Sequence, residues 1–505
     1  MKLKLISIII LLNSFCIIGQ NDKKNEQKSK IPKAEIFRSI QTVVIDGKTI
    51  TLDTEAGTFS LRNQDNEVIA LFGYTFYKQK GTKINLHRPI VFAFNGGPLS
   101  ASVPLHIGAL GPKRVIINDP DYTAGAPYQI TNNKYSILDV ADLVMIDPIG
   151  TGLSKIAGKS KYKDFWGVDQ DIKSIGNFIE QFLIHKEKMN APKYLLGESY
   201  GTFRNAGLVK FLQDKGIAMN GVIMVSAVFE LSHLMFPYGD DFSYLSYFPS
   251  YAATAWYHDK ISDKKPDLEE FMQEVRSFTE NEYAPALFKG DKLSKEEKGA
   301  MSQKLSKYSG LSKKYWQNAD LRVHVREFFV ELHRADGKSI GRLDSRYTGI
   351  NQDLLAQRST YDPMMKALVP PYIAAFKDYF YNDLKVSKNL SYLLFAGSRK
   401  GFKWDWRHKE NITWNAQTSI STAGDLATAM SQNPNLKILI LNGYFDLATP
   451  FYAVEHSINH MGLQAEIKKN IIMKYYKAGH MMYTHEPSLK KFKADIKGFI
   501  LSTSK

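Results

Sequence analysis

The sequence is poor in cysteine and lacks the short motifs of metal and nucleotide sites. It holds one cysteine, Cys16, among 505 residues. Internal disulfides are therefore excluded, and a packed core must supply the stability. The H-E-x-x-H motif, the G-x-x-x-x-G-K-S/T loop and a Rossmann glycine fingerprint after a strand are all missing. We therefore expect no metal and no cofactor.

Long apolar runs are also missing beyond the first twenty residues, so the rest of the chain has no candidate membrane span. Charged residues make up 23% of the chain and aromatic residues 12%, which excludes a disordered, collagen-like or coiled-coil protein. The formal charge of +15 comes from lysines and arginines that are spread without a dense block. That spread favours a solvated basic surface over a nucleic-acid partner.

The first nineteen residues have the pattern of an export signal. Lys2 and Lys4 precede an apolar stretch that ends near the small residue Gly19, and a polar tether over residues 20–33 follows. We expect cleavage there and a periplasmic or extracellular protein with no stable membrane span. Lipid anchoring through Cys16 is the less favoured alternative, because Phe15 rather than a small residue precedes it.

Two kinds of strand pattern predict an α/β fold with a mostly parallel sheet. Segments over residues 39–81 alternate between polar and apolar residues, which is typical of antiparallel strands. Later runs are short and fully apolar and end in glycine-rich turns, as in the buried strands of a parallel sheet. These runs cover residues 89–97, 142–152, 193–201, 221–229 and 436–446. Residues 167–186 have the apolar spacing of a crossover helix.

A long stretch between these strands predicts an inserted, mainly helical cap. We expect the core over residues 34–228 and 415–505 and the cap over residues 229–414. Residues 267–278 have one apolar helical face, and Ser294 with Glu297 forms a capping box that starts another helix. Only residues 391–397, SYLLFAG, resemble a buried strand within the cap.

The sharpest local motif is GESYG, residues 197–201, which follows an apolar strand and precedes a helical stretch. This context is that of a nucleophile elbow, a tight turn that exposes a serine hydroxyl at the carboxyl end of a sheet. We therefore expect Ser199 to be a nucleophile, flanked by Glu198 and Tyr200.

A serine nucleophile needs a general base and an acid that orients it, in the chain order Ser, Asp or Glu, His. Asp446 follows the strand LKILILNG, and His480 follows the strand NIIMKYY in a Gly-His turn. His485 is the competing base but lacks this turn, so we expect Asp446 and His480 to complete a triad with Ser199.

An acyl-transfer site also needs N–H donors for the oxyanion. The turn NGGP, residues 95–98, ends the strand IVFAF, and its glycines would let bare N–H groups face a substrate. We expect Asn95 and Gly97 to lie beside the elbow.

Together these segments resemble the serine carboxypeptidase family of the α/β-hydrolase fold, and in particular its cysteine-poor bacterial branch. The shared motifs are NGGPLSAS from Asn95, DPIGTGLS from Asp147, GESYG, GYFDLATP and AGHMMY. The resemblance covers roughly residues 85–225 and 435–485 and says less about the cap. It implies that Ser199 is the nucleophile, His480 the base and Asp446 its orienting carboxylate. It further implies that the N–H groups of Gly97 and Tyr200 form the oxyanion hole, and that Asn95 and Glu198 hold the substrate's terminal carboxylate.

Two positions depart from the family pattern. Leu99 replaces a glycine after Pro98, which adds bulk beside the oxyanion loop, and Ala109 stands where well-known members carry a glutamate that pairs with the elbow glutamate. The expected function is an exported serine carboxypeptidase that acts on peptides with a free C-terminus. A serine esterase or acyltransferase on the same scaffold, and a catalytically silent binding protein of the envelope, remain alternatives, and the oligomeric state is open.

Overall fold

The structure is a computed structural model that describes residues 32–81, 88–408, 412–413, 416–417 and 420–504. The expected signal segment, residues 1–19, and most of the tether over residues 20–33 lie outside the described residues. In the part that the structure describes, no helix is both long and apolar enough to cross a membrane.

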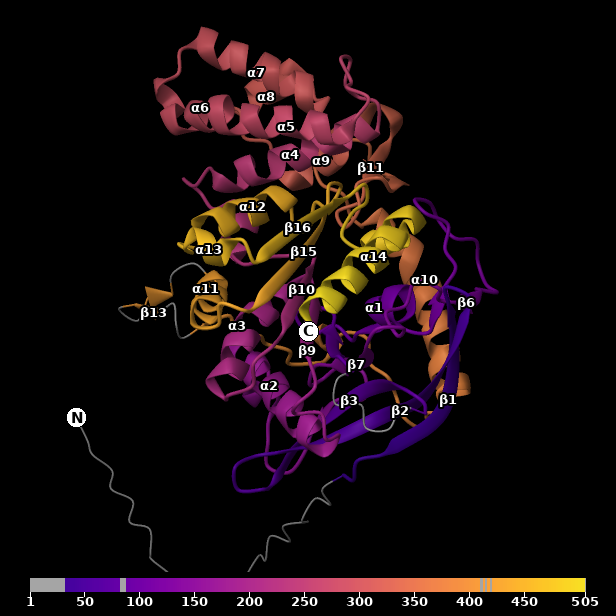
Figure 1. Ribbon diagram of the computed structural model, residues 1–505. Coiled ribbons are helices and arrows are strands. Elements are labelled where there is room, and N and C mark those ends of the chain that lie inside the picture. Colours follow the sequence, from indigo (N-terminus) through magenta and orange to yellow (C-terminus); the bar gives the residue numbers. More distant parts are fainter. Residues whose placement is uncertain (1–31, 82–87, 409–411, 414–415, 418–419, 505) are drawn as a thin grey trace, which may run out of the picture.

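The centre of the molecule is a sheet in the order β1-β2-β3-β7-β4-β9-β10-β15-β16, with β8 beside β3 (Figure 1). The first three strands and β7 pair antiparallel, and all neighbours from β7 to β16 pair parallel. The predicted mostly parallel sheet with antiparallel strands at its start is therefore confirmed. The strands are β1 (Ile36–Ile45), β2 (Lys48–Arg62), β3 (Val68–Gln79), β4 (Ile90–Phe94), β7 (Asp142–Asp147), β8 (Lys155–Ile156), β9 (Lys193–Glu198), β10 (Gly221–Val225), β15 (Lys437–Gly443) and β16 (Ile471–Tyr476).

Helices cover both faces of the sheet. The strand side chains alternate between two cores: in β4, Ile90, Phe92 and Phe94 point to one core, and Val91 and Ala93 to the other. The first core is closed by α2 (Val168–His185), α3 (Tyr200–Asp214) and α11 (Ala423–Gln432), and the second by α1 (Val103–Leu105), α10 (Pro363–Asp378) and α14 (Glu486–Thr503). The strands are buried on both faces, which explains their fully apolar sequences.

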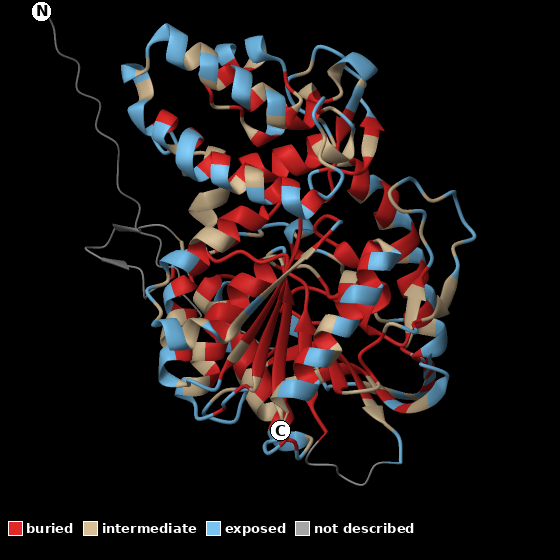
Figure 2. Ribbon diagram, turned by 45° about the horizontal axis from the view of Figure 1, so that its top comes forward, coloured by how far each residue is buried: buried red, intermediate tan, exposed pale blue. Residues whose placement is uncertain are grey.

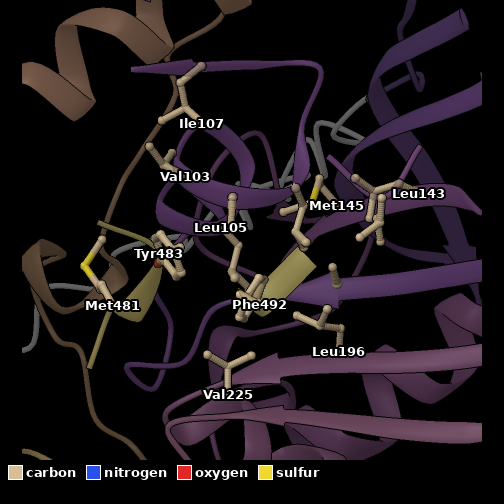
Figure 3. Packing of buried hydrophobic residues seen from close by; sticks show 14 of the residues in the cluster. Val103, Leu105, Ile107, Leu143, Met145, Leu196, Val225, Met481, Tyr483 and Phe492 are labelled. Atoms are coloured by element: carbon tan, nitrogen blue, oxygen red, sulfur yellow. The ribbon is translucent and has the colours of Figure 1, made fainter. Parts of the chain in front are cut away.

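Figure 3 shows the second core from close by. Leu196 of β9 and Val225 of β10 lie below Phe492 of α14, and Leu105 of α1 completes the cluster. Tyr483 and Met481 reach this cluster from the turn after β16, so that turn is anchored by apolar packing.

A group of helices stands above the carboxyl ends of the strands (Figure 1). Their inner faces form a third apolar core that also includes Tyr444, Phe445 and Leu447 from the turn after β15, and their outer faces are exposed (Figure 2). The predicted helix starts are confirmed, because Asp267 caps α5 and Ser294 with Glu297 forms the capping box of α7. The helices are α4 (Phe242–Tyr257), α5 (Leu268–Phe278), α6 (Ala284–Lys289), α7 (Lys295–Ser309), α8 (Lys313–Asn318) and α9 (Val325–Glu331).

The last part of the inserted stretch, from α10 to residue 408, packs on the sheet domain. The helix α10 belongs to the second core, and Tyr392, Ala396 and Trp404 are buried in the two sheet cores. The prediction of a strand over residues 391–397 is wrong. This segment crosses the loops after β4 and β7 and makes only isolated bridges, from Leu393 to Gly152 and from Phe395 to Ser100, because no strand runs alongside it.

Candidate active site

The predicted elbow is a strained turn between β9 and α3. Ser199 has φ 60° and ψ −128°, a conformation that costs a non-glycine residue on the order of 1 kcal/mol. The turn is so tight that a Cβ on Gly197 would lie 2.2 Å from the carbonyl oxygen of Gly201. The glycines of GESYG are therefore required by close backbone approach, and the strain is of the kind stored at functional sites.

Asp446 and His480 meet in front of the elbow. The Oδ2 atom of Asp446 lies 2.7 Å from Nδ1 of His480, and both side chains are buried. Asp446 also accepts hydrogen bonds from the N–H groups of Ala448, at 2.7 Å, and Thr449, at 3.0 Å. These bonds fix the carboxylate so that it orients the imidazole through Nδ1 and leaves Nε2 for the substrate side.

The pKa of His480 is raised above its ordinary value. Burial alone would lower this pKa, but the charge and hydrogen bond of Asp446, aided by the charge of Glu198, outweigh it. An imidazole with a raised pKa is a stronger base and accepts a serine proton more readily.

Ser199 and His480 line one pocket of about 380 Å³, together with Asn95, Gly97 and Glu198. The structure thus brings these sequence-predicted site residues to one cavity. His485, the competing base, does not line it; its Nδ1 lies 2.8 Å from the hydroxyl of Ser488 at the start of α14.

The predicted oxyanion donors also meet at this pocket. Tyr200 begins α3, so its N–H is a first-turn donor with no carbonyl partner inside the helix. The loop after β4 lies directly against it, since a Cβ on Gly96 would come within 2.5 Å of the Tyr200 nitrogen. Gly97 has φ 118°, which a residue with a side chain rarely adopts.

Glu198 is buried beside the nucleophile and has a partner that the sequence analysis missed. The hydroxyl of Tyr483 donates to its Oε2 at 2.7 Å. Burial raises the pKa of Glu198 to about 7, partly offset by His480 and by hydrogen bonds from Tyr483 and Asn95. Tyr483, three residues after His480 in the chain, is thus a hydrogen-bond partner of this carboxyl.

The side chain of Leu99 does not have the effect on the pocket that the sequence predicts. Its φ of 59° lies in the left-handed region, which explains why relatives carry glycine there. The side chain is buried in the core beneath α2 and α3 and does not line the pocket. The expectation of bulk beside the oxyanion loop is therefore wrong, because the backbone turns this side chain away from the substrate side.

One wall of the pocket comes from α10, which sequence reasoning assigned no role. Met365, Leu368, Val369 and Tyr372 line the cavity from successive turns of this helix. Their i, i+3, i+4, i+7 spacing places them on one face. The pocket therefore has a polar floor at the elbow and an apolar side wall.

Residues 342–347 lie between the cap helices and α10, and we name them the stem segment. This segment bonds to the turns of both Asp446 and His480. Four hydrogen bonds connect its backbone and one carboxylate to the turns around Asp446 and His480. They run from Leu447 N–H to Arg342 O at 3.1 Å, from Ser345 N–H to Phe445 O at 2.9 Å, from His480 N–H to Leu343 O at 2.6 Å and from Gly479 N–H to Asp344 Oδ2 at 2.8 Å.

The stem segment is itself held by buried charges. Arg346 bonds to Asp344 at 2.6 Å and to Asp119 at 2.9 Å. Asp119 also accepts from the hydroxyl of Thr484, just after the His480 turn, at 3.2 Å. This network joins the loop after β5 (Lys113–Val115) to both sides of the base. Among the described residues no cluster of three or more His, Cys, Asp or Glu side chains could hold a metal ion.

The fold and this constellation define a serine hydrolase of the α/β-hydrolase class. The sequence matches the serine carboxypeptidase family over residues 47–493, and the chain belongs to that family. The predicted resemblance is thereby confirmed, and with it a serine-type carboxypeptidase.

One solved structure supports the fold. The chain resembles Kex1(Δ)p, a prohormone-processing carboxypeptidase from Saccharomyces cerevisiae, with a TM-score of 0.52 and 16% identity over 88% of this chain and 91% of that chain. It also matches proline iminopeptidase of Mycobacterium smegmatis, with a TM-score of 0.35 and 10% identity over 92% of this chain and 99% of that chain. No curated protein sequence matches the chain significantly.

Proposed function

We propose that the protein is an exported serine carboxypeptidase that releases C-terminal residues from peptides through an acyl-enzyme. The observation that carries this proposal is the 2.7 Å bond between Asp446 and His480 in a pocket shared with Ser199 and with a polar floor of Asn95 and Glu198. A nucleophile, a base and a site for a carboxylate within one cavity are what the removal of a terminal residue requires.

Acylation begins when Nε2 of His480 takes the proton of Ser199 Oγ as that oxygen attacks the last peptide carbonyl. The N–H groups of Gly97 and Tyr200 stabilise the negative charge that develops on the carbonyl oxygen. The carbon–nitrogen bond then breaks, His480 gives its proton to the departing amino group, and the C-terminal residue leaves. The shortened peptide stays bound to Ser199 as an ester.

Deacylation repeats these steps with water as the nucleophile. His480 takes a proton from water, the resulting hydroxide attacks the ester carbonyl, and the proton returns to Ser199 Oγ. The shortened peptide leaves with a new terminal carboxylate.

The floor residues account for a preference for free C-termini. A carboxylate substrate needs hydrogen-bond donors, which the Asn95 amide supplies at any pH and Glu198 supplies only when protonated. The raised pKa of Glu198, about 7, keeps a large protonated fraction up to neutral pH. Asn95 and Glu198 would thus hold the terminal carboxylate on the leaving side of Ser199.

Export rests on the sequence alone. The pattern of residues 1–19 supports removal of a signal and release into the periplasm or medium. Intact-mass analysis of the protein from its host would give a chain that starts near residue 20. A mass that retains Cys16 with an acyl group would instead indicate a membrane anchor.

Activity assays test the enzymatic part of the proposal. The purified protein should react with a fluorophosphonate, and Ser199→Ala should abolish labelling. It should release the last residue from N-blocked dipeptides and act poorly on the same dipeptides with an amidated C-terminus. Hydrolysis of p-nitrophenyl esters without any dipeptide cleavage would favour the esterase alternative, and absence of labelling would favour a silent binding protein.

A further inference from the structure

Arg342, the first residue of the stem segment, is a cation that lines the catalytic pocket. Its charge partly offsets the rise that burial causes in the pKa of the Asp362 carboxyl. Its guanidinium makes no hydrogen bond or ion pair with any residue that the structure describes, and the side chain is exposed at the pocket. Its carbonyl oxygen, by contrast, is committed to Leu447. The backbone thus holds this arginine in place while its charge stays available.

The other charged groups of the pocket are already occupied. Asp362 lines the same cavity, but its carboxylate accepts backbone N–H bonds from Leu343 at 3.1 Å and Met364 at 2.9 Å, as the N-cap of α10. Glu198 bonds to Tyr483, and His480 bonds to Asp446. Among the residues that line the pocket, Arg342 is the permanent cation, and it is available to a ligand.

The place of Arg342 argues against a purely structural role. A structural arginine pairs with a carboxylate or stacks on an aromatic ring, and Arg204, Arg276 and Arg346 do so in this protein. Arg342 also lies close enough to the His480 ring to lower its pKa, which costs the base some strength. The charge of Arg342 weakens the general base His480 and forms no ion pair with the residues that the structure describes. A negatively charged group of the substrate that neutralises this charge explains both features.

We propose that Arg342 binds a carboxylate of the C-terminal residue of the substrate. A guanidinium matches a carboxylate with two parallel N–H bonds, and such charge-assisted bonds are stronger than bonds between neutral groups. Two groups on that residue have this chemistry: the terminal carboxylate itself, and the side-chain carboxylate of a C-terminal Glu or Asp. The inference rests on the proposed carboxypeptidase function and adds a residue from the inserted stretch to substrate recognition.

The test compares Arg342→Gln, Arg342→Lys and the wild type on four substrates. Three are N-blocked dipeptides that end in Leu, Gln or Glu, and the fourth is the p-nitrophenyl ester of the blocked first residue, which has no carboxylate. Arg326→Gln removes an exposed charge from α9, outside the pocket, and is the matched control. Because removal of Arg342 also raises the pKa of His480, kcat/KM is compared on the pH plateau of each variant.

We expect Arg342→Gln to lower kcat/KM by about ten-fold for the carboxylate that it binds, mainly through KM, because about 1.4 kcal/mol of a charge-assisted bond is lost. The ester should change far less, Arg342→Lys should recover part of the loss, and added salt should weaken the wild type more than the Gln variant. Arg326→Gln should match the wild type.

The pattern of losses identifies the carboxylate. Equal losses for all three dipeptides assign Arg342 to the terminal carboxylate, and a loss confined to the Glu substrate assigns it to the side chain. Unchanged dipeptide cleavage, or an ester loss as large as the dipeptide loss, would overturn the inference. A wild type that cleaves the ester but no dipeptide would overturn the proposed function first, and this inference with it.

Discussion

The turns that follow β9, β15 and β16 and the inserted stretch over residues 229–414 build the same pocket by different means. The turns hold Ser199, Asp446 and His480 through local geometry: a strained elbow, and a carboxylate fixed by the N–H groups two and three residues further along the chain. The inserted stretch supplies the wall of α10 and the stem segment through contacts with residues far away in the sequence. Chemistry in this protein is locally encoded, whereas the shape and charge of the pocket depend on the tertiary fold.

Removing a catalytic group should give the largest loss of activity, because the turns that carry these groups perform the chemistry. We expect Ser199→Ala and His480→Ala each to lower kcat for a blocked dipeptide by about a thousand-fold or more. Thermal unfolding should show that both variants still fold. His485→Ala is the control and should retain most of the activity; near-wild-type turnover of His480→Ala would show that the base is misassigned.

Weakening the stem segment tests whether the inserted stretch supports the triad. Asp344 is fully buried against Arg346, so Asp344→Asn leaves a buried cation partly uncompensated. Urea unfolding should show a loss of about 3 kcal/mol in stability. The activity of the folded variant should fall by about ten-fold in kcat, because a small displacement of the His480 turn misaligns the base. Unchanged kcat in a destabilised variant would limit the stem segment to a structural role.

The pH profile tests the turns themselves through Glu198, the last residue of β9. This carboxyl donates to a substrate carboxylate only when protonated, so kcat/KM should fall as the pH rises through about 7. Glu198→Gln donates at every pH and should remove this alkaline limb. It should also move the acid limb to lower pH, because the charge of Glu198 raises the pKa of His480.

Tyr483→Phe gives a smaller shift in the same profile. The Tyr483 hydrogen bond lowers the pKa of Glu198, so its removal should raise that pKa and move the alkaline limb upward. Profiles of kcat/KM for one blocked dipeptide in the wild type and both variants provide the measurement. An alkaline limb that is the same in all three proteins would remove Glu198 from carboxylate recognition and leave Asn95 as the main candidate.

The smallest effect on activity is expected at Leu99. Leu99→Gly removes a buried side chain but also relieves a left-handed backbone, so we expect a net loss of about 1 to 2 kcal/mol in stability. The value of kcat should stay within about two-fold of the wild type, since Leu99 lies outside the pocket. A large change in kcat with unchanged stability would show that the Leu99 side chain does affect the oxyanion loop.

The elements that could be predicted from the sequence are those whose pattern is contained within a short segment of the chain. Fully apolar runs identified the parallel strands, the apolar face over residues 267–278 identified α5, and the capping box of Ser294 with Glu297 identified the start of α7. The elbow could be predicted because its first glycine, Gly197, is demanded by a backbone contact with Gly201 inside the turn itself.

The missed features depend on which segments meet in space. SYLLFAG has the composition of a strand but makes only isolated bridges where it crosses two loops. The face of α10, the Tyr483 hydroxyl on Glu198 and the free charge of Arg342 become visible only when the chain is folded. No sequence pattern distinguishes an arginine at the surface from an arginine that lines a pocket.

The stem segment limits how this enzyme can be re-engineered. The helices α4 to α9 share one apolar core with Tyr444, Phe445 and Leu447 of the turn that holds Asp446, so the cap is not a separate module. Here the residues that follow those helices donate or accept the bonds that shape the turns of Asp446 and His480. A graft that replaces the cap must therefore keep residues 342–347 and also supply new apolar contacts for Phe445 and Leu447, which flank Asp446.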